Sequence, residues 1–171
     1  YRAYKASDKP AITQLVASTF GNSEGQQEGR LIGTLVQDMM STTDSHDLYG
    51  FVAVEGSAVI GAIFFSRLRF DASTEVFILS PVAVATDHQG MGTGQALINY
   101  GLREIKNAGV QYVITYGDPS YYSRVGFHPI SQEAIAPPLA LSQPEGWIGQ
   151  SLTGKAIESI PGRPSCVQAL D

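Results

Sequence analysis

The stretch of sequence that most constrains the fold is VAVATDHQGMGTGQALI, which covers residues 82–98. Within it, Gly90, Gly92 and Gly94 separate an apolar run from a helical pattern of apolar residues. A glycine loop that leads from a strand into a helix makes an anion site, because the first helical N–H groups lack partners and the helix dipole adds about half a positive charge. Glycine also lets the backbone approach a phosphate group closely. We therefore predict a phosphate-binding loop, with a plain tight turn as the alternative.

Two other phosphate-binding motifs do not fit this chain. The dinucleotide pattern G-x-G-x-x-G fails because Gln95 or Leu97 stands where the third glycine is required. The segment GQSLTGKA, residues 149–156, matches the pattern G-x-x-x-x-G-K-[ST] until Ala156, which replaces the hydroxyl that would bind magnesium. The sequence therefore favours neither a dinucleotide site nor a nucleoside-triphosphate site.

Hydrophobic periodicity predicts the elements around the loop. Helices are expected within residues 7–20, 28–40 and 94–109, and strands within 48–56, 58–70, 74–84 and 110–117. The strands on either side of the third helix should be parallel, because a strand–helix–strand unit crosses over the sheet. Pro81 has no N–H donor, so we expect the strand over 74–84 to bulge or splay there.

The remaining segments carry weaker signals. The helix over 28–40 has a wide apolar stripe that should pack on a sheet, made of Leu31, Ile32, Leu35, Val36, Met39 and Met40. Six of the nine prolines lie beyond Phe127, so short strands and irregular connections are expected there. Trp147 in that region is expected in the core, with the wall of a substrate pocket as the alternative.

Composition limits the partners and the location. The 171-residue chain has a formal net charge of −5, whereas nucleic acids and anionic membranes are normally bound by basic surfaces, so we expect neither partner. Cys166 is the only cysteine, so no intrachain disulfide can form, and no two histidines have metal-ligand spacing; we expect no metal. The start, YRAYKASDKP, does not resemble a signal peptide, and we expect a cytoplasmic protein with one domain over residues 1–171.

Two motifs on the expected elements resemble those of one enzyme family. The pattern Q-x-x-G-x-G at Gln89, Gly92 and Gly94 resembles the pyrophosphate-binding motif of the GNAT superfamily of acetyl-CoA-dependent N-acetyltransferases. The segment GDPSYYSRVGF, residues 117–127, holds a Y-x-x-x-G-F arrangement that begins at Tyr122 and is similar to the segment after that family's fifth strand. LSPVAV, residues 79–84, looks like its bulged strand. The resemblance covers about residues 1–130, and residues 131–171 would supply acceptor-side strands.

The resemblance implies an α/β fold of the α+β type, with a mixed, mostly antiparallel central sheet, a bulged and splayed fourth strand, and helices on both faces. It also implies a site for acetyl-CoA as co-substrate. The loop backbone would bind the pyrophosphate, and the bulged strand would pair with the pantetheine arm. The implied cofactor-binding residues are Val82, Ala83, Val84, Gln89, Gly90, Met91, Gly92, Thr93, Gly94 and Gln95.

Catalytic roles follow from the same resemblance. Tyr122 would contact the cofactor and act as the general acid that protonates the departing thiolate. Its neighbour Tyr121 is expected to pack in the core. Glu75 stands at the start of the bulged strand, where some members carry a catalytic glutamate, and a solvated charge at the strand end is the alternative.

The implied activity is the transfer of an acetyl group from the thioester to a primary amine by direct attack. The acceptor would be a small-molecule or protein amine, and the enzyme a monomer or homodimer. Two alternatives stay open at this point: a non-catalytic acyl-CoA-binding regulatory module of the same fold, and an acyltransferase that uses another acyl group.

Overall fold

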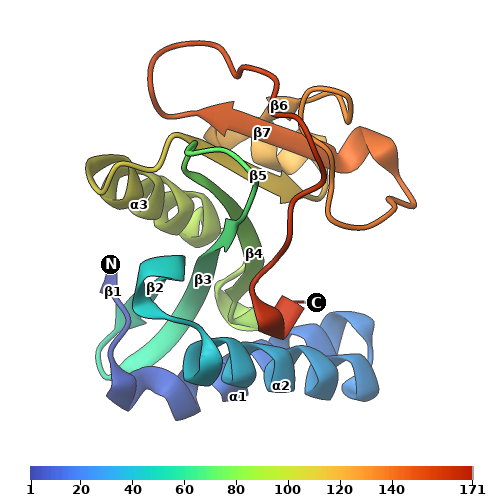
Figure 1. The fold of residues 1–171 in the computed structure, drawn as a ribbon. Coiled ribbons are helices and arrows are strands. Elements are labelled where there is room, and N and C mark those ends of the chain that lie inside the picture. Colours follow the sequence, from blue (N-terminus) through green and yellow to red (C-terminus); the bar gives the residue numbers. More distant parts are fainter. Residues whose placement is uncertain (171) are drawn as a thin grey trace.

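A seven-stranded sheet in the order β1-β2-β3-β4-β5-β7-β6 runs through the protein. It is seen in a computed structural model that describes residues 1–170 (Figure 1). Asp171, the last residue of the predicted domain, lies outside the described part of the chain. All strand pairs are antiparallel except β4 with β5, which are parallel. The predicted mixed, mostly antiparallel sheet is therefore confirmed.

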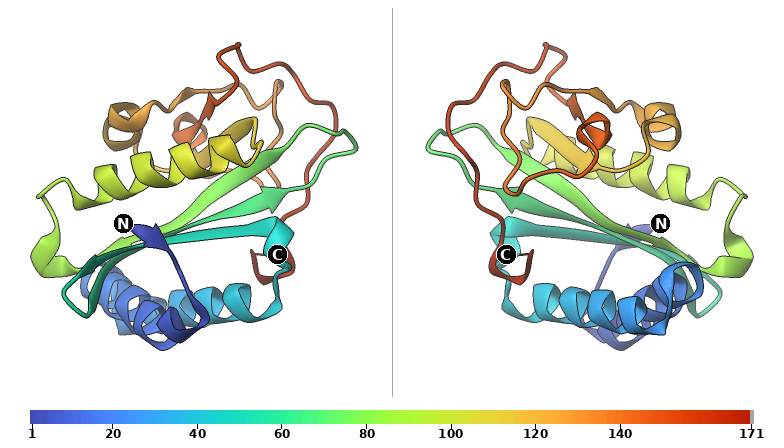
Figure 2. Two further views of the ribbon diagram at one scale, coloured as in Figure 1. Left: turned by 90° about the vertical axis from the view of Figure 1, so that its left-hand side faces the viewer. Right: turned by 90° about the vertical axis from the view of Figure 1, so that its right-hand side faces the viewer.

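The first part of the chain supplies three strands of the sheet and the two helices that cover one of its faces. β1 (Arg2–Ala3) pairs with β2 (Leu48–Glu55), which is joined by a tight turn to β3 (Ala58–Leu68). Between β1 and β2 the chain forms α1 (Lys9–Glu24) and α2 (Gln26–Thr42), separated by Gly25. These two helices cover one face, and α3 (Thr93–Asn107) covers the other, as both views in Figure 2 show.

The fourth strand, β4 (Val76–Val84), bulges where Pro81 predicts it. Ile63 of β3 pairs with Val82, but Phe65 pairs with Leu79, so β4 carries one extra residue between these pairs. The Ser80–Pro81 peptide bond within this bulge is cis. On its other side, β4 pairs with β5 (Tyr112–Tyr116) only as far as Ile78. The two strands then separate, which confirms the predicted splay.

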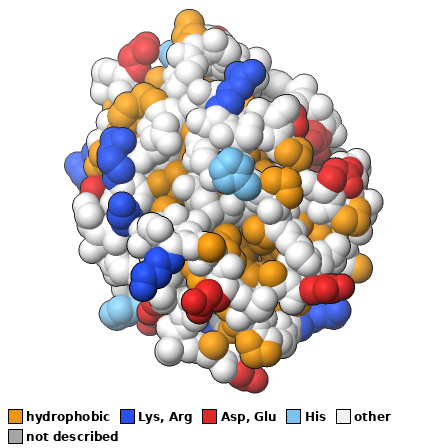
Figure 3. Space-filling view, turned by 90° about the horizontal axis from the view of Figure 1, so that it is seen from above, with side chains coloured by type: hydrophobic (Ala, Val, Ile, Leu, Met, Phe, Trp, Pro, Cys, Tyr) orange, Lys and Arg blue, Asp and Glu red, His pale blue; other side chains and the backbone are white. Residues whose placement is uncertain are grey.

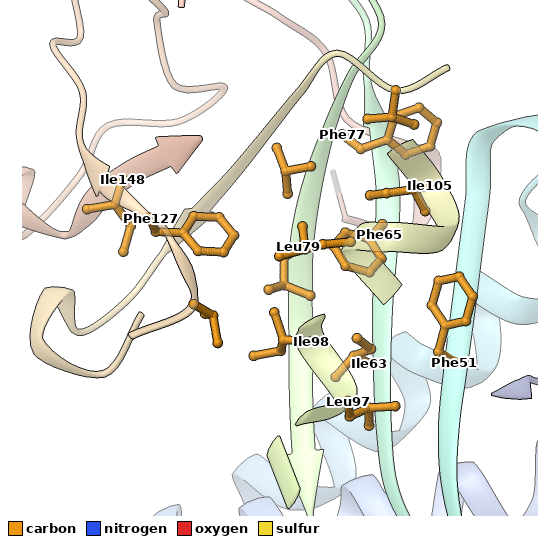
Figure 4. Close-up of a cluster of buried hydrophobic side chains, with 14 of the residues drawn as sticks. Phe51, Ile63, Phe65, Phe77, Leu79, Leu97, Ile98, Ile105, Phe127 and Ile148 are labelled. Carbon is orange, nitrogen blue, oxygen red and sulfur yellow. The ribbon is translucent and has the colours of Figure 1, made fainter. Parts of the chain in front are cut away.

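The helix α3 connects β4 to β5 and anchors the glycine loop. Its apolar residues Leu97, Ile98 and Ile105 are fully buried and point toward the sheet (Figure 4). They meet Phe65 of β3 and Leu79 of β4 in a cluster that continues to the C-terminal half of the chain. Because this packing locks α3 against β3 and β4, it also fixes the N-terminus of α3 beside the splayed end of β4.

The C-terminal third is mostly irregular, as its prolines predict. It contributes α4 (Pro119–Tyr122), β6 (His128–Pro129) and β7 (Trp147–Ser151), and its last turn packs against α2. Trp147 is 1% exposed and its indole N–H donates to the Ile135 carbonyl, so its predicted place in the core is confirmed. Seen from above, hydrophobic side chains gather near the middle of this face of the molecule, and charged side chains of both signs lie around them (Figure 3).

One prediction about helix packing is wrong. The sequence pattern places Leu31 in the buried stripe of α2, but its side chain is 60% exposed, whereas Val36, Met39 and Met40 are buried. The physical reason is the close approach of α1. A methyl group on Gly29 would lie 2.4 Å from the Ala17 carbonyl oxygen, so α2 turns its glycines toward α1 and Leu31 toward solvent.

Candidate functional site

A cleft of about 740 Å³ opens where β4 and β5 separate. Its walls come from the end of α1, the splayed part of β4, the glycine loop and α4. The lining residues are Thr19, Phe20, Ser23, Val82, Val84, His88, Gln89, Gly90, Gly92, Thr93, Gly94, Gln95, Asp118, Tyr121 and Arg124. The structure therefore brings together most of the loop and strand residues that the sequence singles out.

The glycine loop presents a row of free N–H groups to this cleft. Gly90 and Gly92 have φ angles of +79° and +82°, a left-handed conformation that residues with a Cβ rarely adopt. The first N–H of α3 that bonds within the helix is that of Ala96, which donates to Gly92. Among the described residues, no hydrogen-bond acceptor is found for the N–H groups from Gly90 to Gln95. These donors, together with the helix dipole, form an anion site.

Side chains brace the loop against its neighbours. The Gln89 amide donates to the Val84 carbonyl over 2.9 Å, so this glutamine ties the loop to the end of β4. Asn22 of α1 donates to the Thr86 hydroxyl over 3.0 Å, which holds the loop from the other side. The sequence pattern marks Gln89 but does not reveal that its side chain, rather than only its backbone, shapes the loop.

Gly94 serves a different purpose from the other two glycines. It lies in the first turn of α3 with ordinary helical backbone, but a Cβ there would lie 2.4 Å from the Tyr121 hydroxyl oxygen and 3.3 Å from a Val84 methyl. The absence of a side chain at Gly94 therefore makes room for Tyr121 to reach the N-terminus of α3.

The splayed half of β4 forms the second wall. Beyond Ile78 it has no strand partner on the β5 side within the described residues, while β3 still pairs with Val82, Ala83 and Val84. Val82 and Val84 line the cleft, whereas Ala83 is buried against α1 and α2 on the other face of the sheet. One edge of a strand is thus open to an extended ligand.

The short helix α4 brings two tyrosines to the site. Asp118 caps it by accepting hydrogen bonds from the Ser120 N–H and hydroxyl, and Pro119 occupies its first turn. Tyr121 lines the cleft, and its ring lies edge-on against Tyr122, with centroids 5.0 Å apart. The sequence predicts only core packing for Tyr121, so Tyr121 is a residue of the cleft that sequence reasoning missed.

Tyr122 lies deeper than Tyr121. Its ring packs against Phe127 with centroids 5.7 Å apart, and Gly117 leaves room for it, because a Cβ at Gly117 would lie 2.6 Å from the ring. Burial raises the pKa of Tyr122 to about 12, so its hydroxyl holds its proton throughout the neutral range. Tyr122 is not one of the residues that line the cleft, and any reaction beside it would meet a neutral phenol.

Glu75 lies apart from this group of residues. It stands just before β4, at the end of that strand remote from the loop, and its carboxylate pairs with Arg67, which also binds Asp47. Its side chain is 43% exposed and it does not line the cleft. The structure therefore does not bring Glu75 together with Tyr122 and the loop, and its predicted role as base finds no supporting contact.

The cleft also holds Arg124, which the sequence reasoning did not assign to it, and His88, which that reasoning considered for the pyrophosphate site but expected on the surface. Arg124, one turn beyond Tyr121, lines the cleft and has no ion-pair partner among residues 1–170. His88 sits at the loop, where hydrogen bonds to Asp87 and Glu55 raise its pKa. Only the position of Arg124 inside the GDPSYYSRVGF segment could have signalled its presence. Arg124 thus adds a cation to a cleft that already carries free N–H donors, and His88 adds a second positive charge when it is protonated.

The described part of the chain offers no metal centre and no membrane span. Within residues 1–170, no group of three or more His, Cys, Asp and Glu side chains is placed to hold a metal ion. In the same part of the chain, every helix is too short or too polar to cross a bilayer.

Comparison with known proteins identifies the family. The family model of the acetyltransferase (GNAT) domain matches residues 1–130. The chain is 31% identical to an uncharacterized N-acetyltransferase, YjhQ, of Escherichia coli K12, over 94% of this chain and 87% of that protein. The crystal structure of the GNAT-family N-acetyltransferase YhbS from Escherichia coli, in complex with CoA, superposes with a TM-score of 0.85 and 24% identity, covering 99% of this chain and 89% of the other.

A second solved structure shares the fold. A GNAT-family acetyltransferase from Brucella melitensis, in complex with acetyl-CoA, superposes with a TM-score of 0.71 and 24% identity, covering 99% of this chain and 96% of that protein. The family match, the curated relative and the fold agree with the two motifs read from the sequence. The chain belongs to the GNAT family and is an N-acetyltransferase.

Proposed function

We propose that the cleft binds acetyl-CoA and that the enzyme transfers its acetyl group to a primary amine. The observation that carries this proposal is that the N–H groups from Gly90 to Gln95 have no acceptor among the described residues, and that all of these residues except Met91 line the cleft at the N-terminus of α3. These donors match the oxygens of a pyrophosphate, and Arg124 adds a cation beside them. The CoA in the YhbS structure and the acetyl-CoA in the Brucella structure support this ligand.

The open edge of β4 suits the pantetheine arm. An extended chain with amide groups pairs with an unpartnered strand edge as an added strand would. Val82 and Val84 line the cleft on that edge, and Ala83 contributes backbone between them. The arm would then run from the loop toward the point where β4 and β5 separate, and the proposal puts the thioester within reach of Tyr122, which follows the lining residue Tyr121 on α4.

The proposed reaction is a direct transfer. The lone pair of a neutral amine attacks the thioester carbonyl carbon, a C–N bond forms, and the C–S bond breaks. The thiolate of CoA leaves and takes a proton from the Tyr122 hydroxyl, while the ammonium proton of the product passes to water, from which Tyr122 regains its proton. The products are the N-acetylated amine and CoA with a free thiol.

Tyr122 is the proposed general acid, and ordered water is the proposed route for the amine proton. A carboxylate base inside the cleft is poorly suited, because the hydrogen bonds from Ser120 lower the pKa of Asp118, the one carboxylate within residues 1–170 that lines it. Glu75 is paired with Arg67 elsewhere. By the family resemblance the acceptor site would lie within about residues 20–45 and 130–171, of which Asp171 lies outside the described part of the chain. The monomer or homodimer state and the cytoplasmic location stay predictions.

The decisive experiment titrates desulfo-CoA into purified protein by calorimetry. Gly92→Asp places a carboxylate in the proposed pyrophosphate site and should abolish binding. Gly56→Asp is the matched control, because Gly56 also has a positive φ and no atom within 4 Å of the position that a Cβ would take, but lies in the β2–β3 turn. Binding that is lost in Gly92→Asp and kept in Gly56→Asp supports the site; equal loss, or no binding by folded wild type, overturns it.

A thiol-release assay then separates an enzyme from a mere binder. Acetyl-CoA is incubated with a panel of polyamines, amino acids, aminoglycosides and peptide N-termini, and free CoA is measured. Amine-dependent release that falls about a hundredfold in Tyr122→Phe supports the proposed general acid. Binding without release from any acceptor, or faster release with a longer acyl-CoA, favours the regulatory module or the other acyl group.

A further inference from the structure

Tyr121 places its hydroxyl group against the first turn of α3. The hydroxyl oxygen would lie 2.4 Å from a Cβ built on Gly94, and the next ring atom 3.8 Å from it. On α4, the Tyr121 N–H donates to the Asp118 carbonyl, and the ring is held edge-on against the ring of Tyr122. The side chain therefore reaches from α4 across to the N-terminus of α3, beside the glycine loop.

Gly94 gives this hydroxyl its access to the end of the helix. Gly90 and Gly92 have positive φ angles, but Gly94 does not, so its backbone conformation would accept alanine. Alanine would also favour the helix. The space that an alanine methyl would take is occupied by the Tyr121 oxygen. The conformation of the loop therefore does not call for glycine at position 94, whereas the approach of Tyr121 does.

The Tyr121 hydroxyl has a proton but no acceptor for it. No hydrogen bond of this hydroxyl is found among residues 1–170. The first turn of α3 offers N–H donors, which cannot accept a proton either. Within the same residues, the buried side-chain atoms without a partner belong only to Thr43 and Ser66, so the Tyr121 oxygen stays open to the cleft that this residue lines. Burial raises the pKa of Tyr121, which keeps the hydroxyl protonated at neutral pH.

The same side of α4 carries a second donor. Arg124 follows Tyr121 by three residues, in the turn that continues α4, and residues at this spacing lie on one side of a helix. Both side chains line the cleft opposite the N–H groups of residues 90–95. Donors from the loop, from α3 and from α4 thus surround one part of the cleft. A group that only accepts hydrogen bonds, such as a pyrophosphate, fits such a set.

We propose that Tyr121 is a cofactor-binding residue, whose hydroxyl donates a hydrogen bond to the pyrophosphate of CoA at the N-terminus of α3. This inference rests on the proposed function, which puts the pyrophosphate in the glycine loop. Tyr121 and Arg124 then hold the pyrophosphate from the α4 side, and the loop backbone holds it from the other side. The hydroxyl keeps its proton throughout, so Tyr121 has a binding role and the acid role stays with Tyr122.

The first test measures desulfo-CoA affinity by calorimetry. Tyr121→Phe removes the hydroxyl and keeps the ring, and we expect it to weaken binding about fivefold. Tyr100→Phe is the matched control and should leave the affinity unchanged. Tyr100 is also partly buried against the same core cluster, and its ring also packs edge-on against an aromatic ring, that of Phe51, but it does not line the cleft.

A double variant separates the lost donor from altered packing. In Gly94→Ala/Tyr121→Phe, the alanine methyl refills the space of the missing oxygen and lies 3.8 Å from the nearest ring atom. If Tyr121→Phe weakens binding only because it leaves a gap, the double variant should bind as tightly as wild type. If the donor is what matters, binding should stay about fivefold weaker than in wild type.

Phosphorus NMR of bound desulfo-CoA locates the contact on the ligand. The pyrophosphate and the ribose phosphate of this ligand give separate resonances. At saturation, the pyrophosphate resonances should differ between wild type and Tyr121→Phe, while the ribose phosphate resonance stays in place. Tyr100→Phe should move neither.

The outcomes distinguish this inference from the proposed function. If folded wild type does not bind desulfo-CoA, the proposed function fails. If wild type binds but Tyr121→Phe binds equally well, or the double variant regains wild-type affinity, the hydroxyl is not a ligand of the cofactor and the inference is overturned. It is also overturned if binding weakens while the pyrophosphate resonances stay unmoved, because the hydroxyl then contacts another part of the ligand.

Discussion

Replacing Gly94 by alanine tests the fit between the glycine loop and α4. Gly94 has helical backbone, so alanine is compatible with its φ and ψ and has higher helix propensity, worth up to about 1 kcal/mol. The new methyl group would nevertheless lie 2.4 Å from the Tyr121 hydroxyl oxygen, whereas ordinary contacts begin at 3.4 Å. The Tyr121 hydroxyl must therefore retreat by about 1 Å, a distance that follows from the same two values.

The size of the effect follows from this displacement. Tyr121 packs edge-on against Tyr122, so its ring has no free space on that side and moves toward the cleft. Inserting a methyl group into a packed site costs about 1–3 kcal/mol, which the helix propensity of alanine partly offsets. We expect Gly94→Ala to lower the free energy of unfolding by about 1 kcal/mol and to weaken acetyl-CoA binding about tenfold.

The matched variant is Tyr121→Phe, which removes the clashing oxygen. The next ring atom would lie 3.8 Å from the alanine methyl, an ordinary contact distance. In this background Gly94→Ala should be neutral or stabilise the protein by up to about 1 kcal/mol, so the two changes couple by about 1–2 kcal/mol. Urea unfolding gives the stabilities, and calorimetry with acetyl-CoA gives the affinities.

The double mutant distinguishes an indirect effect through Tyr121 from direct obstruction of the ligand. Affinity should return to the level of Tyr121→Phe alone when both changes are present. If Gly94→Ala weakens binding equally with tyrosine or phenylalanine at position 121, then the methyl group blocks the ligand directly and the contact with Tyr121 is irrelevant. If it weakens binding in neither background, the cofactor does not approach this turn of α3.

Two further predictions concern pH. Hydrogen bonds from Arg2 lower the pKa of Asp8 to about 2, so this carboxylate stabilises the fold above its unfolded pKa of about 4, and the contribution is lost as the pH falls toward 2. Asp8→Asn should lower the free energy of unfolding at pH 7 by about 1 kcal/mol, since Arg2 is partly exposed, and flatten the acid limb in urea titrations. Hydrogen bonds that His88 donates to the Asp87 and Glu55 carboxylates raise its pKa, so its positive charge beside the loop is lost as the pH rises through the neutral range. Calorimetry should show acetyl-CoA affinity falling over that range, and the fall should be absent in His88→Gln.

Local signals in the sequence predict the elements around the loop well. Alternating or continuous apolar runs place β2, β3, β4 and β5 within a few residues, because these strands are buried on one or both faces. Pro81 places the bulge, since it cannot donate to a ladder. Gly90 and Gly92 mark the loop because their left-handed backbone requires glycine. In each case the residue itself carries the physical constraint.

Predictions fail where the constraint lies in the partner element. The apolar pattern of α2 is compatible with several rotations about its axis, and only the contact of Gly29 with α1 selects the one that exposes Leu31. A glycine inside a helix lowers helix propensity, and nothing in the local sequence says that it serves close packing. The C-terminal third is also poorly predicted from the local sequence. The burial of Trp147 could be predicted from its residue type, but the loops around it depend on long-range contacts such as that of Ile135 with Ile160.

The two tyrosines of α4 show that the site depends both on constraints that a residue carries itself and on constraints that a neighbouring element imposes. Adjacent residues of a helix point about 100° apart, so Tyr121 and Tyr122 must face different surroundings. The motif read from the sequence marks Tyr122, whose ring fills the space left by Gly117 and packs against Phe127. Tyr121 instead fills the space left by Gly94, a glycine that belongs to the other motif. The glycine loop and the tyrosine segment are therefore one structural unit: Gly94 leaves the space that Tyr121 fills, so the cost of a side chain at position 94 should depend on whether residue 121 keeps its hydroxyl.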